Sequence, residues 1–141
     1  MRLSDEERQE FLARPHVAAL SVAVPGRGPL SMPIWYGYHP GGEAWIITSP
    51  ASKKVAAIRE AGRFTLLVDE VGPTLTYVSV EGVLVGIAPA TADEIETMAA
   101  RYLNGAALTA YLTEVSATHG EQVTVRLEPE RWLGAQIPMS S

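Results

Sequence analysis

Seven short apolar stretches, separated by turns rich in glycine and proline, constrain the fold of this chain more than any other feature. They lie at residues 17–24, 30–38, 44–49, 63–68, 76–87, 122–127 and 132–137. Each stretch has the length of a strand, and most of the connections are short. Closely spaced antiparallel strands of this number usually close into a small barrel. Gly82 and Gly86 fall inside the longest stretch, which predicts a bulge or a bend at a barrel corner.

Helix-capping signals place helices between these strands. Ser4-x-x-Glu7 and Thr91-x-x-Glu94 are capping boxes, in which a hydroxyl and a carboxylate satisfy the first free N–H groups of a helix. They predict a short N-terminal helix and a second helix after the longest strand. A further apolar stretch at residues 108–115 predicts its helical partner, so we expect a helical pair before the last strands. The fold class is therefore mainly β, of the α+β type.

Composition narrows the class of protein. At 141 residues the chain is expected to form a single domain, residues 1–141. No apolar run is long enough to span a membrane, and the acidic N-terminus lacks the apolar core of a signal peptide. The absence of cysteine excludes disulfides and thiolate metal sites, and a net charge of −5 argues against nucleic acid as a partner. We expect a cytoplasmic protein.

The only two lysines of the chain are neighbours at the expected start of a helix. Ser52 is a good N-cap for that helix, so Lys53 and Lys54 fall in its first turn. The helix dipole already makes this end positive, and each added cation costs roughly 0.3–1 kcal/mol there. A bound anion would compensate, held by free backbone N–H groups, the Ser49 and Ser52 hydroxyls and both ammonium groups. Solvated lysine pairs also occur at helix starts, but we interpret this segment as a phosphate site.

Two segments of the chain carry a resemblance to a known family. The run Ile46-Ile47-Thr48-Ser49-x-x-Ser52-Lys53-Lys54 resembles the flavin-phosphate segment of the pyridoxamine 5′-phosphate oxidase-like split β-barrel superfamily. Downstream, Tyr77-Val78-Ser79-Val80-Glu81-Gly82 looks like the family's strand ending in Val-Glu-Gly. The resemblance extends over roughly residues 4–137. It implies a six- to seven-stranded antiparallel split β-barrel.

The resemblance also implies a set of cofactor-binding positions. The phosphate would be held by Thr48, Ser49, Ser52, Lys53 and Lys54, the tricyclic ring would lie along Pro33, Ile34 and Trp35, and Ile46 and Ile47 would supply apolar contact. Tyr77 stands where the oxidases carry a ring-contacting glutamine, and a phenol cannot reproduce an amide's pair of hydrogen bonds. The oxidases' C-terminal substrate segment, with its arginine and histidine, is also missing. Oxidation of pyridoxamine phosphate is therefore not expected.

The chemistry that the resemblance implies is hydride transfer from a reduced cofactor to a small, conjugated, electron-poor substrate such as an enone or a quinone. The lost glutamine, the small size and the composition favour the deazaflavin F420 slightly over FMN. Tyr36, Tyr38 and Tyr77 are candidate proton donors, although water is an equal candidate. The alternative function is a flavin- or haem-binding protein without strong turnover, and a purely structural barrel would leave both lysines without a role.

Two further expectations concern metals and partners. His16, His39 and His119 are isolated and have no metal-ligand spacing, so no metal site is expected. Barrels of this family are usually homodimers in which both chains build each cofactor groove. Trp35, Tyr36, Tyr38 and Trp45 give more aromatic surface than one small barrel needs to bury, which agrees with a homodimer. The expected ligands are otherwise small molecules.

Overall fold

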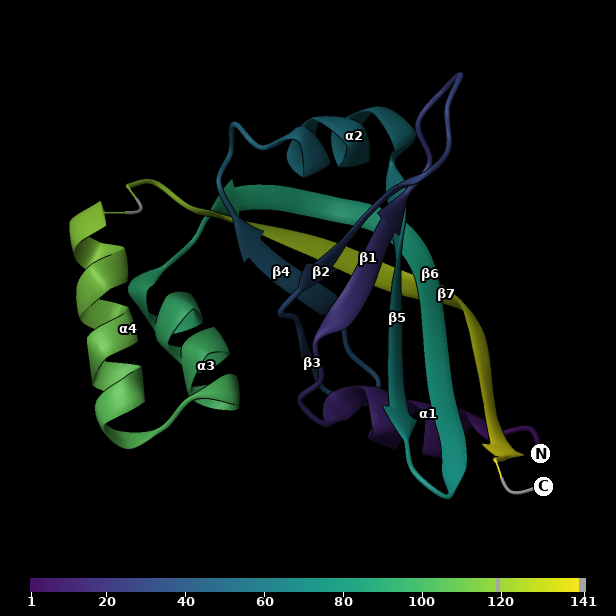
Figure 1. The fold of residues 1–141 in the computed structure, drawn as a ribbon. Coiled ribbons are helices and arrows are strands. Elements are labelled where there is room, and N and C mark those ends of the chain that lie inside the picture. The colour runs from purple at the N-terminus through teal and green to yellow at the C-terminus, as the bar shows by residue number, and fades with distance from the viewer. Residues whose placement is uncertain (119, 140–141) are drawn as a thin grey trace.

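The computed structural model describes residues 1–118 and 120–139 and contains four helices and seven strands in that part of the chain (Figure 1). In order they are α1 (Asp5–Ala13), β1 (Ala18–Val22), β2 (Leu30–Ile34), β3 (Gly37–Tyr38), β4 (Ala44–Thr48), α2 (Lys53–Ala61), β5 (Arg63–Val71), β6 (Thr74–Pro89), α3 (Ala92–Tyr102), α4 (Gly105–Thr118) and β7 (Val123–Pro138). The strands form one antiparallel sheet in the order β2-β1-β5-β6-β7-β4-β3. This arrangement confirms the mainly β, α+β split-barrel prediction.

The sheet curls around one core, and the helices cover its open parts. Figure 1 shows α2 across one end of the barrel and α1 across the other, with α3 and α4 forming a lobe beside β4. The side chains of Leu20, Leu66 and Val80 point inward from neighbouring strands and are fully buried, as are Leu12 of α1 and Ile58 of α2. Both predicted capping boxes are present, and Gly62 ends α2 in the left-handed conformation that favours glycine.

Two strand predictions differ from the structure. The stretch at residues 30–38 is broken into β2 and β3, because the Tyr36 N–H donates to the Tyr102 hydroxyl (3.1 Å) and not to a neighbouring strand. The stretches at 122–127 and 132–137 are one strand, β7. Pro129 looks like a strand breaker in the sequence, but it lies opposite Gly82 where the pairing register shifts. A bulge is one of the few places in a sheet where proline is tolerated.

The bulge or bend predicted at Gly82 and Gly86 is confirmed as two irregularities in strand pairing. The register between β6 and β7 shifts at Glu81/Gly82 and again at Leu84/Gly86. At the first shift the β7 backbone crosses so close to Gly82 that a Cβ atom there would overlap the carbonyl oxygen of Glu128. At Gly86 a Cβ would meet nothing. The two glycines therefore have different roles, since only the first is required by close approach of the backbone.

Two neighbouring residues of α3 attach the helical lobe to the barrel. Arg101 donates to the Tyr36 carbonyl (2.7 Å) and the Ala13 carbonyl (2.8 Å), and its guanidinium lies over the Tyr36 ring. Tyr102 donates to the His16 carbonyl at 2.7 Å. Because Ala13 ends α1, the Arg101 cation also lies at the negative end of that helix dipole. Arg101 thus joins α3 to α1 and to the segment between β2 and β3.

We expect Arg101→Met to lower the free energy of unfolding by about 2–3 kcal/mol, because the half-buried carbonyls lose charge-assisted hydrogen bonds. Urea denaturation followed by circular dichroism measures the change. Arg59→Met is the control, since Arg59 is an exposed arginine on α2, and about 0.5 kcal/mol or less is expected there. An equal loss for both variants would contradict the anchoring role.

Candidate functional site

The residues predicted to hold a phosphate meet where β4 passes into α2. Lys54 is half-buried, and its Nζ donates to the Thr48 Oγ1 at 3.0 Å. Lys53 and Ser49 are exposed beside it. The Ser52 hydroxyl caps α2 by accepting from the Val55 N–H at 3.4 Å. The contiguous segment therefore places two ammonium groups and three hydroxyls around the N-terminus of one helix.

The electrostatics of this segment suit an anion. The first turn of α2 contains no acidic residue, and neither lysine forms an ion pair within residues 1–118 and 120–139. The first N–H groups of a helix have no partner inside it and carry its positive dipole end. Uncompensated cations, free N–H donors and a tethered Lys54 are the donor set that a phosphate group requires.

The residues predicted to line the cofactor ring do not all face the same pocket in the structure. Trp35 and Ile47 line a pocket beside β4, whereas Ile46 is fully buried in the barrel core. Alternate side chains of a strand face opposite sides of the sheet, so Ile46 does not contact a ligand next to Ile47. Pro33 is exposed on β2, and Ile34 packs against the core.

Two of the three candidate proton donors are structural. The Tyr36 side chain is fully buried, and its hydroxyl donates to the Leu12 carbonyl at 2.6 Å. Burial raises the pKa of Tyr36 far above its ordinary value. Tyr38 is also buried, its pKa is raised by burial, and its hydroxyl lies 3.4 Å from the Gln9 Oε1. Neither phenol is among the residues that line the pocket beside β4, and neither adds aromatic surface for a second chain to cover.

Tyr77 does not lie with the lysines. It pairs with Ala135 near the start of β6, whereas Thr48 pairs with Val123, which in turn pairs with Pro89 at the far end of β6. Twelve positions along one strand correspond to roughly 40 Å of chain. Within one protomer, Tyr77 and the lysine segment are therefore at opposite ends of the sheet.

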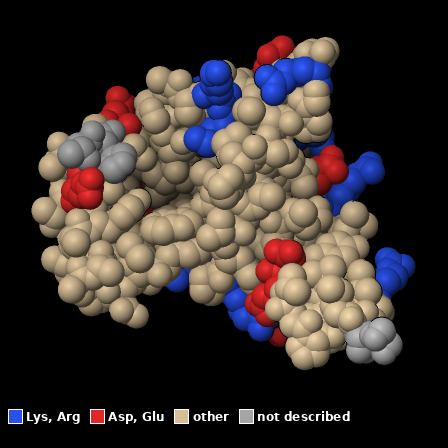
Figure 2. All heavy atoms as spheres, viewed as in Figure 1, with Lys and Arg blue, Asp and Glu red and all other residues tan. Residues whose placement is uncertain are grey.

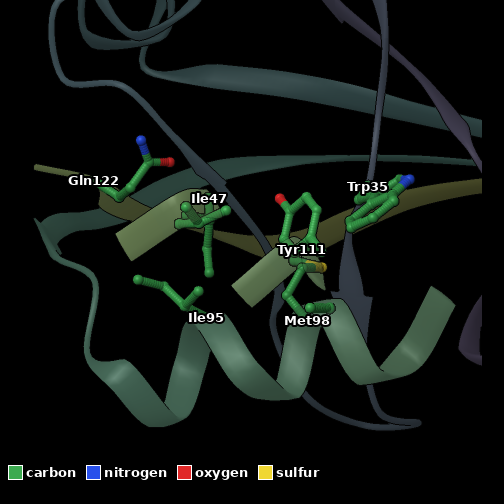
Figure 3. Close-up of a pocket in the computed structure, with 8 residues that line it drawn as sticks. Trp35, Ile47, Ile95, Met98, Tyr111 and Gln122 are labelled. Carbon is green, nitrogen blue, oxygen red and sulfur yellow. The ribbon is translucent and has the colours of Figure 1, made fainter. Parts of the chain in front are cut away.

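A pocket lies between the site strand and the helical lobe (Figure 3). Its walls come from β4, from the segment after β2, from α3 and α4, and from the residue before β7: Trp35, Ile47, Ile95, Met98, Ala99, Tyr111, Val115 and Gln122. The Trp35 ring stacks on Tyr102 with centroids 4.6 Å apart and lies 5.4 Å from the Tyr111 ring. The sequence predicted both helices but gave them no role in the site.

The distribution of surface charge agrees with the positions of the lysine segment and the pocket. Figure 2 shows basic side chains over α2 and a hollow below them, between the barrel and the helical lobe. The lysine segment continues directly from Ile47, which lines the pocket. A molecule with an anionic end at α2 and an apolar ring directed into the hollow would match this surface.

The two described histidines, His16 and His39, belong to no cluster of possible metal ligands. No group of three or more possible ligands gathers within residues 1–118 and 120–139. Both ring nitrogens of His16 are engaged, Nε2 with Glu70 at 2.7 Å and Nδ1 with the Tyr36 hydroxyl at 3.2 Å, which leaves neither for a haem iron. His39 is exposed, and His119 lies outside the described residues. No helix in the described part of the chain is long and apolar enough to cross a membrane.

Comparison with known families identifies the class of protein. Residues 4–135 match the pyridoxamine 5′-phosphate oxidase family, so the chain belongs to that family. The match includes both segments that carried the sequence resemblance. No curated protein sequence matches the chain.

Solved structures share the fold at low sequence identity. The conserved hypothetical protein Rv2991 from Mycobacterium tuberculosis has a TM-score of 0.72 and 22% identity, with 99% of this chain and 91% of that chain covered. An FAD-binding protein from Mesorhizobium loti gives 0.67 and 20%, covering 96% and 95%. An F420 reductase gives 0.68 and 17%, covering 88% and 94%. These similarities show a common fold.

Proposed function

We propose that this protein is an oxidoreductase that uses reduced F420 or FMN to transfer a hydride to a small, conjugated, electron-poor substrate. One observation carries the proposal: the Lys54–Thr48 contact at 3.0 Å holds an ammonium group at the start of a helix that has no acidic residue in its first turn. The adjoining strand leads from this cation-rich point directly to the pocket at Ile47. Membership of the pyridoxamine 5′-phosphate oxidase family supports the assignment.

The protein's own residues have three tasks in this proposal. Lys53 and Lys54 bind the cofactor phosphate, with Ser49 and the first N–H groups of α2 as neutral donors. Trp35 and Ile47 present apolar surface to the ring, and the helical lobe shields that surface from water. The cofactor supplies the hydride chemistry, and the protein supplies orientation and exclusion of water. The proton that completes reduction comes from water or from Tyr77.

F420 is the cofactor we favour, with FMN as the alternative. Both carry a phosphate on a tricyclic ring system, so the lysine segment suits either. The similar structures include an F420 reductase and two FAD-binding proteins, which supports a flavin-type ligand without separating the two. The departure from glutamine at Tyr77 is the residue-level reason to place F420 first.

The proposal includes a homodimer formed through one face of the sheet. Exposed or half-buried apolar side chains gather on the outer side of β5, β6 and β7, which we call the outer face: Leu67, Val71, Leu75, Tyr77, Leu133 and Ile137. An apolar patch of this kind marks an interaction surface. Because Tyr77 lies in the middle of this face and far from the lysines of its own chain, it would contact a cofactor only across a dimer interface.

The test is the affinity of the apo-protein for each cofactor. We expect Lys54→Ala to weaken binding at least tenfold, or about 1.4 kcal/mol, measured by fluorescence titration with F420 and separately with FMN. Arg59→Ala is the matched control, because it removes a cation from the last turn of the same helix, and its affinity should stay within about twofold of the wild type. Unchanged affinity in Lys54→Ala would reject the phosphate-anchoring role.

A flavin-type binding protein without strong turnover is the second candidate. Burial of the Tyr36 and Tyr38 hydroxyls favours it, because two of the three phenols are removed from the chemistry. Reoxidation of bound, reduced cofactor by menadione under anaerobic conditions separates the candidates. An unchanged reoxidation rate with and without protein would support the binding role over the enzyme.

A further inference from the structure

The pocket between β4 and the helical lobe has an unusual lining. Among the residues around it, Trp35, Ile47, Ile95, Met98, Ala99, Tyr111, Val115 and Gln122, none is charged. A phosphate or carboxylate placed among them would lose its hydration without gaining a cation, which is strongly unfavourable. The pocket therefore differs in chemistry from the lysine segment, which follows directly after Ile47. It suits an uncharged, largely apolar molecule.

Two residues of the lining, Tyr111 and Gln122, carry polar side-chain groups, and the Tyr111 hydroxyl gives the pocket a direction. Figure 3 shows Tyr111 between Trp35 and Ile47, with its hydroxyl on the Ile47 side. This hydroxyl forms no hydrogen bond with any residue in the described part of the chain. Tyr111 is 37% exposed, and its hydroxyl can donate to an acceptor held in the pocket beside Ile47. A carbonyl oxygen on an otherwise apolar ring is complementary to this arrangement.

The volume of the pocket is too small for a ring compound in this structure. Its volume is about 60 Å³, whereas an apolar protein cavity of about 150 Å³ is the size that accommodates benzene. One wall is lightly attached: none of the side chains of α4 at residues 105–117 is buried. Gly105 begins this helix and Gly120 follows it, with φ of 54° and 57°, values that side chains disfavour. An outward shift of α4 would enlarge the pocket without disturbing the barrel core.

We propose that this pocket is the substrate site, that it selects uncharged planar ring compounds bearing a carbonyl group, and that α4 moves outward to admit them. The carbonyl oxygen accepts from the Tyr111 hydroxyl, and the ring lies against the side chains of α3, beside the surface of Trp35 and Ile47 that faces the cofactor ring. The term substrate rests on the proposed oxidoreductase function. The binding of the ring compound does not, and it is tested without any cofactor.

The experiment compares two probes of similar shape on the full-length apo-protein. 1-Tetralone is a neutral two-ring ketone, and 1-naphthoate is a two-ring carboxylate. We expect saturation-transfer NMR and calorimetry to detect tetralone, with naphthoate at least tenfold weaker. Tyr111→Phe should weaken tetralone about fivefold or more and leave the fold unchanged. Val115→Trp should fill the pocket and abolish binding, whereas Thr113→Trp, at an exposed position of the same helix, should leave it intact.

Three results would overturn the proposal: equal binding of tetralone and naphthoate, full binding by Val115→Trp, or no effect of Tyr111→Phe. Lys54→Ala separates this inference from the cofactor assignment, because it should lose cofactor affinity and keep tetralone affinity. If Lys54→Ala binds cofactor normally while Val115→Trp still excludes tetralone, the phosphate assignment fails and the pocket assignment survives.

Discussion

Gly82→Ala is expected to lower the free energy of unfolding by about 2–4 kcal/mol, the cost of forcing extra volume against fixed backbone. The Cβ of an alanine would overlap the Glu128 carbonyl, which belongs to the β7 backbone and not to a flexible side chain. Relief requires β6 and β7 to separate at the first register shift. These two strands form the longest pairing in the sheet, so their separation weakens both halves of the barrel.

Gly86→Ala is the matched control for this prediction. It lies on the same strand beside the second register shift, and a Cβ there would meet no atom within 4 Å. Urea denaturation of both variants should give a change for Gly86→Ala of at most about 1 kcal/mol in either direction. If the two alanines have equal effects, the close approach at Gly82 is not what requires glycine.

The fold was predictable where the signal is local. Capping boxes depend on residues three positions apart, and both helices that they predicted are present. The bulge at Gly82 was predictable as a weakness in a strand, but its partner was not, because Glu128 is distant in sequence and is brought there only by strand pairing. The continuity of β7 was not predictable for the same reason, namely that the partner residue is distant in sequence. Pro129 is tolerated within β7 only because Gly82 lies opposite.

In the candidate site, too, the residues that depend on local sequence were predictable and those that depend on distant contacts were not. The segment from Thr48 to Lys54 is contiguous, so a strand, a cap and a helix start suffice to assemble it. Ile46 and Ile47 are neighbours of equal hydrophobicity, and alternation alone does not say which of them faces the core. The burial of Tyr36 depends on Arg101, more than sixty residues away. The pocket likewise requires α3 and α4 to fold back onto β4, which no local pattern predicts.

Leu133→Glu is expected to raise the dissociation constant of the proposed homodimer at least a hundredfold, or about 2.7 kcal/mol. Leu133 is 66% exposed in the single chain, so the substitution should leave the barrel itself intact. In a dimer formed through the outer face, the new carboxylate would be buried without a cation, and each chain would contribute one. The net charge of −5 per chain adds repulsion between the two copies.

Val85→Glu provides the control for the dimer prediction, because Val85 is also exposed, at 52%, and is the unpaired residue of the second bulge in β6, outside the outer face. Sedimentation velocity over a range of protein concentrations should show a dimer for the wild type and for Val85→Glu, and a monomer for Leu133→Glu.

The monomeric variant also tests the position of Tyr77. If the partner's Tyr77 contacts the cofactor, the monomer should bind F420 or FMN more weakly although both of its lysines are intact. A wild-type protein that sediments as a monomer at every concentration would contradict the dimer, and with it the only route by which Tyr77 reaches the site.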